Sequence, residues 1–277
     1  MKLRACCKIN IGLDVLRRRS DGYHDLHTVM VPVRGLFDVL DIEPSGCGED
    51  IFSQTGIAVD CQPEQNLCIA AARLMRSRYG IGGMRISLEK RIPFGAGLGG
   101  GSSDCTAVIR AADRLFGLGL GDEELARCAA QLGSDTVFFL HDRAQFCQGR
   151  GEIMSPAEPL PAGMHLIVAK PAEMVSTAAA YRGVKPAVPQ VPLLQRLGRP
   201  MAEWQQCVVN DFERSVFAQY PRIAQLKESL TAAGAIYASM SGSGSACFGI
   251  FGSAEQADAW KPPFGDVFVH REQTGGD

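Results

Sequence analysis

The chain has 277 residues, of which 46% are hydrophobic and 21% are charged, and its formal net charge is −2. This length predicts one large or two moderate domains with an ample core. The near-neutral charge argues against a broad nucleic-acid-binding surface. The longest apolar runs are shorter than 18 residues, so we expect no membrane-spanning helix and no membrane partner.

The cysteines and histidines indicate neither a disulfide framework nor a zinc site. Ten cysteines include no CxxC pair, and the five histidines are scattered. The N-terminal ten residues carry charge but lack the apolar core of a signal peptide, so we expect buried free thiols in a reducing cytoplasm. The cysteines that lie in apolar runs are Cys6, Cys68, Cys105, Cys128, Cys147 and Cys247.

The first periodic segment is KINIGLDV, residues 8–15, in which apolar and polar residues alternate. Alternation with a period of two predicts a half-buried strand. Lys8 and Asn10 then share its polar face, because both have even parity.

Further strands are expected over residues 27–33 and 37–43, with a turn at Gly35 between them. The run MRISLEK, residues 84–90, alternates in the same way and should place its apolar side chains inward. The apolar run TVFFL, residues 136–140, is also expected to form a strand.

Apolar stripes, capping residues and stop signals predict the helices. Asn66 is expected to cap the first helix and Gly80 to end it. Pro221 suits the first turn of a later helix, and Ser253 with Gln256 forms a capping-box pattern. The expected helical segments are 66–80, 104–117, 122–133, 220–234 and 253–260.

Two proline-rich stretches interrupt this order of strands and helices. SPAEPLPAG, residues 155–163, is the best candidate for a domain boundary, and KPAVPQVP, residues 185–192, is expected to be a surface loop. Strands and helices without strict βαβ alternation predict an α+β fold. We expect an N-terminal domain over 1–154 and a C-terminal domain over 155–277.

The most unusual segment is IPFGAGLGGGSSD, residues 92–104. Its GAGLGG (95–100) matches the dinucleotide pattern GxGxxG, but four residues separate it from the preceding strand, so this match is weak. A Walker A loop needs lysine at position 101, where this chain has Gly101. Successive amides, two serine hydroxyls and a helix start favour an anion-binding loop, with a flexible linker as the alternative.

The glycine-rich segment resembles the phosphate loop of the GHMP kinases, which phosphorylate small metabolites. Other segments resemble one family among them, the 4-diphosphocytidyl-2-C-methyl-D-erythritol kinases. These segments, in chain order, are CKINIGLDVLRRRSDGYHDLHTV, LGSDTVFFLHDRAQFCQGRGE, NDFE (210–213) and MSGSGSACFGIF (240–251). The resemblance covers most of the chain and implies ATP-dependent phosphorylation of the 2-hydroxyl of the methylerythritol part of a cytidine diphosphate conjugate, a step in non-mevalonate isoprenoid precursor synthesis.

The family's architecture then implies a two-domain GHMP kinase fold. Its N-terminal domain is related to a ribosomal-protein fold (ribosomal protein S5 domain 2-like), and its C-terminal domain is ferredoxin-like. The family also implies ATP with Mg²⁺ as the phosphoryl donor, a small-molecule partner, and a monomer or homodimer in the cytoplasm. No acidic pair in the sequence marks a metal site, so the Mg²⁺ ligands stay unassigned, with Ser103 a possible contact.

The resemblance also assigns roles to single residues. Asp135 corresponds to the base that accepts the proton of the substrate hydroxyl, and Lys8 to the lysine that assists it; Asp135 also belongs to the substrate site. The residues that match substrate-binding positions are Asn10, Tyr23, His24 and Tyr181, with the aromatic rings expected at the cytosine. The residues that match ATP-binding positions are Asn66, Lys90, Pro93, Gly95, Ala96, Gly97, Leu98, Gly99, Gly100, Gly101, Ser102 and Ser103.

Ordinary structural roles are open for many of these residues: a capping aspartate for Asp135, a solvated lysine for Lys8 or Lys90, a helix cap for Asn66, a packing ring for Tyr181. The loop SGSGS, residues 241–245, is either a hairpin turn or a loop that lines the substrate site and supports the phosphate loop. The sequence departs from the family around Asp135. The family usually has alanine before this aspartate and valine-proline after it, whereas this chain reads SDT, with Ser134 before Asp135 and Thr136 after it.

Three alternative functions remain open at this point. Another GHMP kinase, acting on mevalonate-, homoserine- or sugar-type substrates, is disfavoured by DGYH, because those substrates lack a base to stack. A regulator without turnover is disfavoured because Lys8 and Asp135 are both present. A redox enzyme using the GxGxxG loop would show cofactor absorbance.

Overall fold

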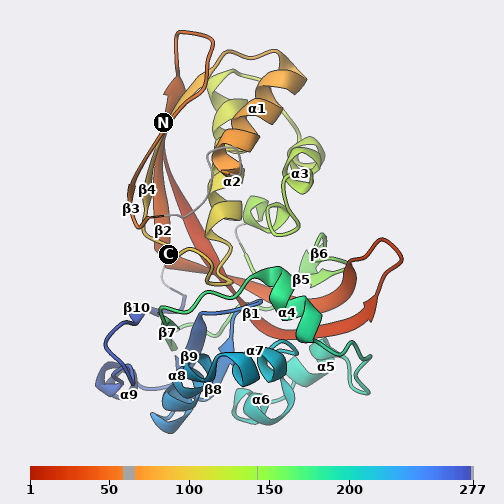
Figure 1. Cartoon of the computed structure of the whole chain (residues 1–277), viewed down its shortest axis with the longest axis vertical. Helices are drawn as coiled ribbons and strands as arrows, with labels where there is room; N and C mark the ends of the chain where they lie inside the picture. Colours follow the sequence, from red (N-terminus) through yellow and green to blue (C-terminus); the bar gives the residue numbers. More distant parts are fainter. Residues whose placement is uncertain (59–65, 142, 276–277) are drawn as a thin grey trace. The chain divides into compact units, whose positions relative to one another are not determined.

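The computed structural model describes residues 1–58, 66–141 and 143–275 (Figure 1). These residues form two compact units, each assembled from several stretches of chain. The first unit comprises the described residues within 1–8, 32–94 and 99–142; the second comprises those within 9–31, 95–98 and 143–277. The predicted boundary between residues 154 and 155 stays a prediction.

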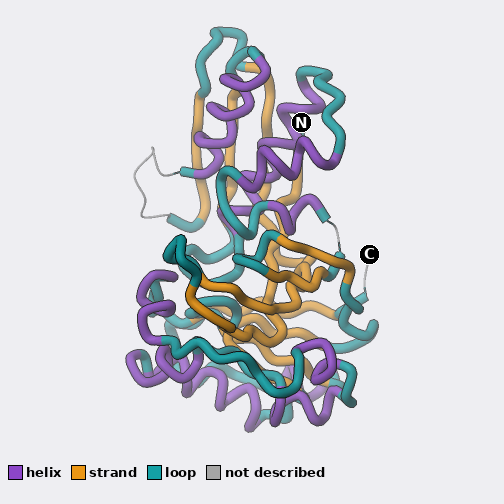
Figure 2. Tube along the Cα trace, turned by 90° about the vertical axis from the view of Figure 1, so that its right-hand side faces the viewer, coloured by secondary structure: helices purple, strands orange, loops and turns teal. Residues whose placement is uncertain are grey.

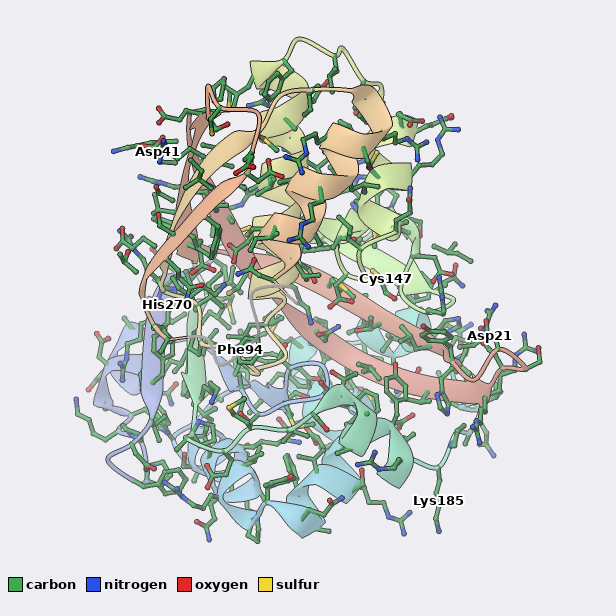
Figure 3. The ribbon with its side chains drawn as sticks, turned by 45° about the horizontal axis from the view of Figure 1, so that its top comes forward. Asp21, Asp41, Phe94, Cys147, Lys185 and His270 are labelled. Carbon is green, nitrogen blue, oxygen red and sulfur yellow. The ribbon has the colours of Figure 1, made fainter. Side chains whose placement is uncertain are left out.

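Two long antiparallel strands supply both units with sheet. β1 (Lys2–Arg18) pairs with β2 (His24–Pro44), and Figure 3 shows Asp21 at the tip of the hairpin that joins them. The predicted turn at Gly35 is wrong: β2 continues through this residue, which keeps extended backbone. Interstrand hydrogen bonding along β2 outweighs the weak tendency of a single glycine to break a strand.

The first unit holds β3 (Ile51–Gly56) and β4 (Met84–Lys90), which pair in parallel, and β4 pairs with β2 in antiparallel orientation. The alternation predicted for residues 84–90 is confirmed, because every second side chain of β4 is buried. Figure 1 shows α1 (Leu67–Tyr79) and α2 (Gly100–Leu115) beside these strands, and the two helices pack on each other.

Local signals place the ends of α1 where the sequence predicts them. Asn66 Oδ1 accepts a hydrogen bond from Cys68 N at 2.9 Å, and Gly80 ends the helix in the left-handed conformation, with φ of 65°. α3 (Asp122–Ala130) is three residues shorter than predicted. The predicted strand 136–140 is wrong: Val137–Leu140 form a 3₁₀ helix, η2, because Thr136 is fixed by side-chain hydrogen bonds.

The second unit contains a short antiparallel pair and a four-stranded sheet. β5 (Gln145–Gln148) pairs with β2 and with β6 (Ile153–Pro156). The four-stranded sheet has the order β10-β7-β9-β8, and its pairs are antiparallel. Its strands are β7 (His165–Lys170), β8 (Tyr237–Met240), β9 (Cys247–Phe251) and β10 (Phe268–Gln273).

The second unit also contains helices, some of which pack on the four-stranded sheet (Figure 2). They are α4 (Thr177–Gly183), α5 (Leu193–Leu197), α6 (Met201–Cys207), α7 (Glu213–Gln219), α8 (Pro221–Ala232) and α9 (Ala254–Ala259). α8 starts at Pro221 as predicted, and Ser253 caps α9 by accepting from Gln256 N. α8 packs on β8 and β9, where Leu226, Leu230 and Phe251 belong to a buried apolar cluster.

Together, the mixed sheets and helices confirm the α+β class predicted from the sequence. The described cysteines form no disulfide, as predicted. Cys68, Cys105, Cys128, Cys147 and Cys247 are buried as expected, whereas Cys6 is half-buried.

Candidate active site

The first unit brings the predicted base and lysine together. Lys8 Nζ lies 3.5 Å from Asp135 Oδ2. Lys8 is 3% exposed, whereas Asp135 is 34% exposed. The strand predicted over residues 8–15 is confirmed as part of β1. Its polar face is also buried, since Lys8, Asn10 and Asp14 are at most 3% exposed, so only the predicted half-burial is wrong. A buried ammonium beside a carboxylate that reaches solvent suits proton transfer from a bound hydroxyl.

Gly99 gives the Lys8 side chain its space. A Cβ built on Gly99 would lie 2.9 Å from Phe139 Cζ and 3.2 Å from Lys8 Cε, and Gly99 has a φ of 72°. A side chain here would meet both neighbours in a backbone conformation that L-residues rarely adopt. The start of α2 and the Lys8–Asp135 pair are therefore packed against each other within one unit.

Thr136 fixes the backbone that carries Asp135. Its Oγ1 lies 2.5 Å from the carbonyl oxygens of Ala129 and Gly133, and its carbonyl accepts from Thr106 Oγ1 at 2.7 Å. Thr136 is fully buried. These bonds tie the end of α3, α2 and the start of η2 together, so the carboxylate sits on an anchored segment. The sequence offered only the SDT triplet as a signal for this anchor.

The glycine loop begins against the 241–245 loop of the second unit. Gly97 has a φ of 73°, and a Cβ there would lie 2.1 Å from Ser241 O. Ser241 Oγ donates to Gly97 O at 3.0 Å, and Ala246 N donates to Ala96 O at 3.0 Å. Residues 241–245 thus form the turn of the β8–β9 hairpin and also hold residues 96 and 97.

Asn210, in the NDFE segment, holds the same hairpin loop. Its Nδ2 donates to Met240 O and Gly242 O, both at 2.8 Å, and Asn210 is 2% exposed. Its role was not assigned from the sequence. The sequence marked it only as the first residue of NDFE, a segment that resembles the family.

The N-terminus of α2 is suited to binding an anion. In the described part of the chain no side chain caps it, and Gly99 is the N-cap residue. The first amides of a helix have no partner within the helix, and the helix dipole places partial positive charge there. With Gly100, Gly101, Ser102 and Ser103 forming the first turn, this end of α2 favours a phosphate. Ser103 is 4% exposed, and Phe94 is 40% exposed near the start of the loop (Figure 3).

Asn66 and Lys90 have structural partners in the first unit. Asn66 caps α1, as described above. Lys90 is 4% exposed and donates to Asp104 Oδ2 at 2.7 Å and to Asp38 Oδ2. A solvated Lys90 is therefore wrong, and its ammonium lies in a buried ionic cluster.

Asn10 is buried within the second unit. Its Nδ2 donates to Thr28 Oγ1 at 3.1 Å, and its backbone N donates to Ser241 Oγ at 3.3 Å. Asn10 is 2% exposed. Through Ser241, Asn10 is connected to the hydrogen bond that holds Gly97.

The second unit brings two of the three predicted aromatic residues into contact. The His24 and Tyr181 rings stack with their centroids 4.8 Å apart and an interplanar angle of 21°. Phe212 packs edge-on against Tyr181, 4.8 Å away. Burial and the nearby Arg18 charge lower the pKa of His24 below its ordinary value, so its imidazole is neutral at pH 7.

Tyr23, in the same unit, has a different aromatic contact and is 55% exposed. Its ring lies 4.8 Å from the guanidinium carbon of Arg150 in a cation–π contact. Arg150 was not assigned from the sequence, where it is one arginine in the motif QGRGE. An exposed aromatic ring with an adjacent cation is suited to binding a planar, negatively charged ligand.

Within residues 1–58, 66–141 and 143–275, no group of three or more His, Cys, Asp or Glu side chains could hold a metal ion. The described helices also include none with the length and apolar character to cross a membrane.

Comparison with known proteins gives consistent matches. Residues 66–143 match the GHMP kinases N terminal domain, and residues 190–261 match the GHMP kinases C terminal. The 4-diphosphocytidyl-2-C-methyl-D-erythritol kinase of Bacteroides fragilis is 42% identical over 251 residues, covering 90% of this chain and 91% of that protein. The enzyme of that name from Porphyromonas gingivalis is 40% identical over 253 residues, covering 91% and 92%.

Solved structures give the same result. A crystal structure of 4-(cytidine 5′-diphospho)-2C-methyl-D-erythritol kinase matches with a TM-score of 0.79 and 34% identity, covering 100% of both chains. The mevalonate kinase of Methanococcus jannaschii matches with a TM-score of 0.72 at 12% identity, covering 98% of this chain and 97% of that one, which shows a shared fold. The two-domain GHMP kinase fold predicted from the sequence is confirmed.

Proposed function

Because the chain belongs to the 4-diphosphocytidyl-2-C-methyl-D-erythritol kinase family of the GHMP kinases, we propose that it transfers the γ-phosphoryl group of ATP to the 2-hydroxyl of 4-diphosphocytidyl-2-C-methyl-D-erythritol. This reaction is a step in the non-mevalonate synthesis of isoprenoid precursors. The observation that carries the proposal is the ion pair of Lys8 and Asp135, 3.5 Å apart, beside the Gly99 start of α2.

Asp135 is the proposed base. Its carboxylate takes the proton of the substrate hydroxyl as that oxygen forms a bond to the γ-phosphorus and the bond to the β-phosphate oxygen breaks, releasing ADP. Lys8 orients Asp135 through the ion pair, and its charge offsets the negative charge on the attacking oxygen. Phosphoryl transfer needs such positioning and charge more than covalent chemistry.

The glycine loop and the start of α2 are the proposed site for the ATP phosphates. Backbone amides of residues 95–103 donate to the phosphate oxygens, and the dipole of α2 favours their charge. Pro93 leads into this loop, and Asn66 and Lys90 are further residues proposed to contribute to ATP binding. Mg²⁺ bound to the ATP would offset negative charge on the phosphates held by these amides.

His24, Tyr181 and Tyr23 are the proposed cytidine-recognition residues. The His24–Tyr181 stack and its Phe212 support present aromatic surface for a base. Stacking a base on an aromatic ring contributes roughly 1–3 kcal/mol. Asn10, fixed by Thr28, orients the substrate or the backbone near it.

A coupled assay of ADP release tests the function. We expect turnover with the cytidine diphosphate conjugate and Mg·ATP, and little turnover with the same alcohol lacking cytidine. Asp135→Asn should abolish turnover while leaving ATP affinity within several-fold. Asp122→Asn, the same substitution at an exposed position at the start of α3, is the matched control. Full activity of Asp135→Asn would remove it as the base, and equal turnover of both alcohols would remove the cytidine site.

We further propose that the protein acts in the cytoplasm as a monomer or homodimer. Light scattering coupled to gel filtration distinguishes the two states. Activity that depends on protein concentration would indicate that the dimer is the active form.

A further inference from the structure

One lysine and two aspartates form a buried cluster in the first unit, which we call the Lys90 cluster. Lys90 Nζ donates to Asp104 Oδ2 at 2.7 Å and also contacts Asp38 Oδ2. The exposed fractions of the Lys90, Asp104 and Asp38 side chains are 4%, 3% and 0%. The three residues come from β4, α2 and β2, so the cluster links three separate elements.

The cluster lies against the first turn of α2. A Cβ on Gly100 would lie 3.0 Å from Lys90 Nζ and 2.9 Å from Ile92 Cγ2. Asp38 Oδ1 accepts from Arg91 N at 2.5 Å and from Ile92 N at 2.8 Å. The cluster therefore fixes the chain just before the glycine loop and the helix that follows it.

The charges of the Lys90 cluster do not balance when both carboxyl groups are ionised. One ammonium then faces two carboxylates, which leaves a buried net charge of about −1. In the described part of the chain, Asp104 Oδ1 is buried without a hydrogen-bond partner. An unpaired buried carboxylate oxygen is costly, and a proton on Asp104 would neutralise the cluster.

The surroundings of Asp104 favour its protonated form. Burial raises the pKa of Asp104 to about 7; Lys90 opposes this shift and Asp38 adds to it. Among the described residues, the thiols of Cys105 on α2 and Cys68 on α1 also interact with Asp104, and burial raises the pKa of both. Lys90 keeps its charge, because the attraction of Asp104 and Asp38 outweighs its desolvation and raises its pKa.

We propose that Asp104 is a positioning residue for ATP: its neutral carboxyl group, held by Lys90, keeps the first turn of α2 in place for the phosphates, and loss of its proton weakens nucleotide binding. The inference rests on the proposed phosphate site at this helix end. An ionised Asp104 adds negative charge to the first turns of α2 and opposes the anion attraction of its N-terminus.

Nucleotide affinity as a function of pH tests the proposal. The probe is the non-hydrolysable ATP analogue AMPPNP with Mg²⁺, measured by calorimetry with the full chain. Between pH 6.5 and 8.5 we expect the wild-type Kd to rise about 3- to 20-fold, since binding is linked to a proton with a pKa near 7. Asp104→Asn, which is neutral at every pH and close in shape, should show a nearly constant Kd.

Arg91→Gln is the matched control, because its exposed side chain lies next to Lys90 in sequence but outside the cluster. It should follow the wild type. Equal pH dependence in the wild type and Asp104→Asn would overturn the role of Asp104 and leave the ATP site standing. Absence of binding by the wild type at every pH would overturn the ATP site itself.

A second measurement needs no nucleotide. Hydrogen–deuterium exchange of residues 99–106 reports the order of the first turns of α2. Lys90→Met, which leaves two carboxyl groups without their cation, should speed this exchange at least roughly tenfold relative to Arg91→Gln. If Lys90→Met does not fold, Lys90→Arg serves in its place, with a smaller increase expected. Unchanged exchange in a folded Lys90 variant would overturn the positioning role.

Discussion

Replacing Lys8 by methionine removes the buried charge beside Asp135 and keeps most of the length of the side chain. At the 3.5 Å separation of Lys8 Nζ and Asp135 Oδ2, Coulomb's law gives about 1 kcal/mol at the dielectric constant of water and about 5 kcal/mol at an effective value of 20. Lys8 is buried and Asp135 is partly exposed, so an intermediate value of about 2–4 kcal/mol applies. At about 1.4 kcal/mol for each tenfold change, kcat should fall roughly 30- to 1000-fold.

Initial rates of ADP release, measured with saturating Mg·ATP and the cytidine diphosphate conjugate, give kcat directly. Lys2→Met places the same substitution at the exposed start of the same strand and should leave kcat unchanged. Thermal unfolding confirms that the Lys8 variant is folded at the assay temperature. A folded Lys8→Met protein with a kcat within twofold of the wild type would refute the electrostatic role of Lys8.

The other predictions concern the aromatic stack, the glycine loop and pH. Tyr181→Leu should raise the KM for the cytidyl substrate about 5- to 100-fold, because roughly 1–3 kcal/mol of stacking is lost, while the KM for ATP stays constant in initial-rate assays. Gly97→Ala should raise the KM for ATP at least about tenfold, because its φ is 73° and the new Cβ would lie 2.1 Å from Ser241 O; Gly22→Ala, at φ of 86° with open space around it, should leave that KM unchanged. The lowered pKa of His24 keeps the ring neutral at pH 7, so its protonation at acidic pH should weaken stacking and raise the KM for the cytidyl substrate. A KM–pH profile unchanged in His24→Gln would contradict this assignment.

Local sequence signals were sufficient to place several helix termini. Asn66 and Gly80 bound α1, Pro221 opens α8, and Ser253 caps α9, as the sequence predicted. These features act within one turn of backbone, so they do not depend on the rest of the fold.

Elements that depend on distant partners were predicted less well. Gly35 does not break β2, because the strand is held by neighbours far away in sequence. Residues 137–140 form a 3₁₀ helix, not a strand, because Thr136 hydrogen-bonds to Ala129 and Gly133. α2 begins at Gly100, four residues before the predicted start, and Gly100 fits closely against Ile92, a contact that local sequence does not reveal.

By itself, the sequence determined the family, the glycine loop and the identity of the candidate residues, because motif order along a chain needs no coordinates. Only the tertiary structure decided what these residues touch. In the folded chain, Lys8 lies beside Asp135, and the His24 ring stacks on Tyr181. Tyr23 contacts Arg150, and Lys90 is buried between two aspartates. Each of these contacts joins segments separated by many residues, and their charges and burial arise only when the chain is folded.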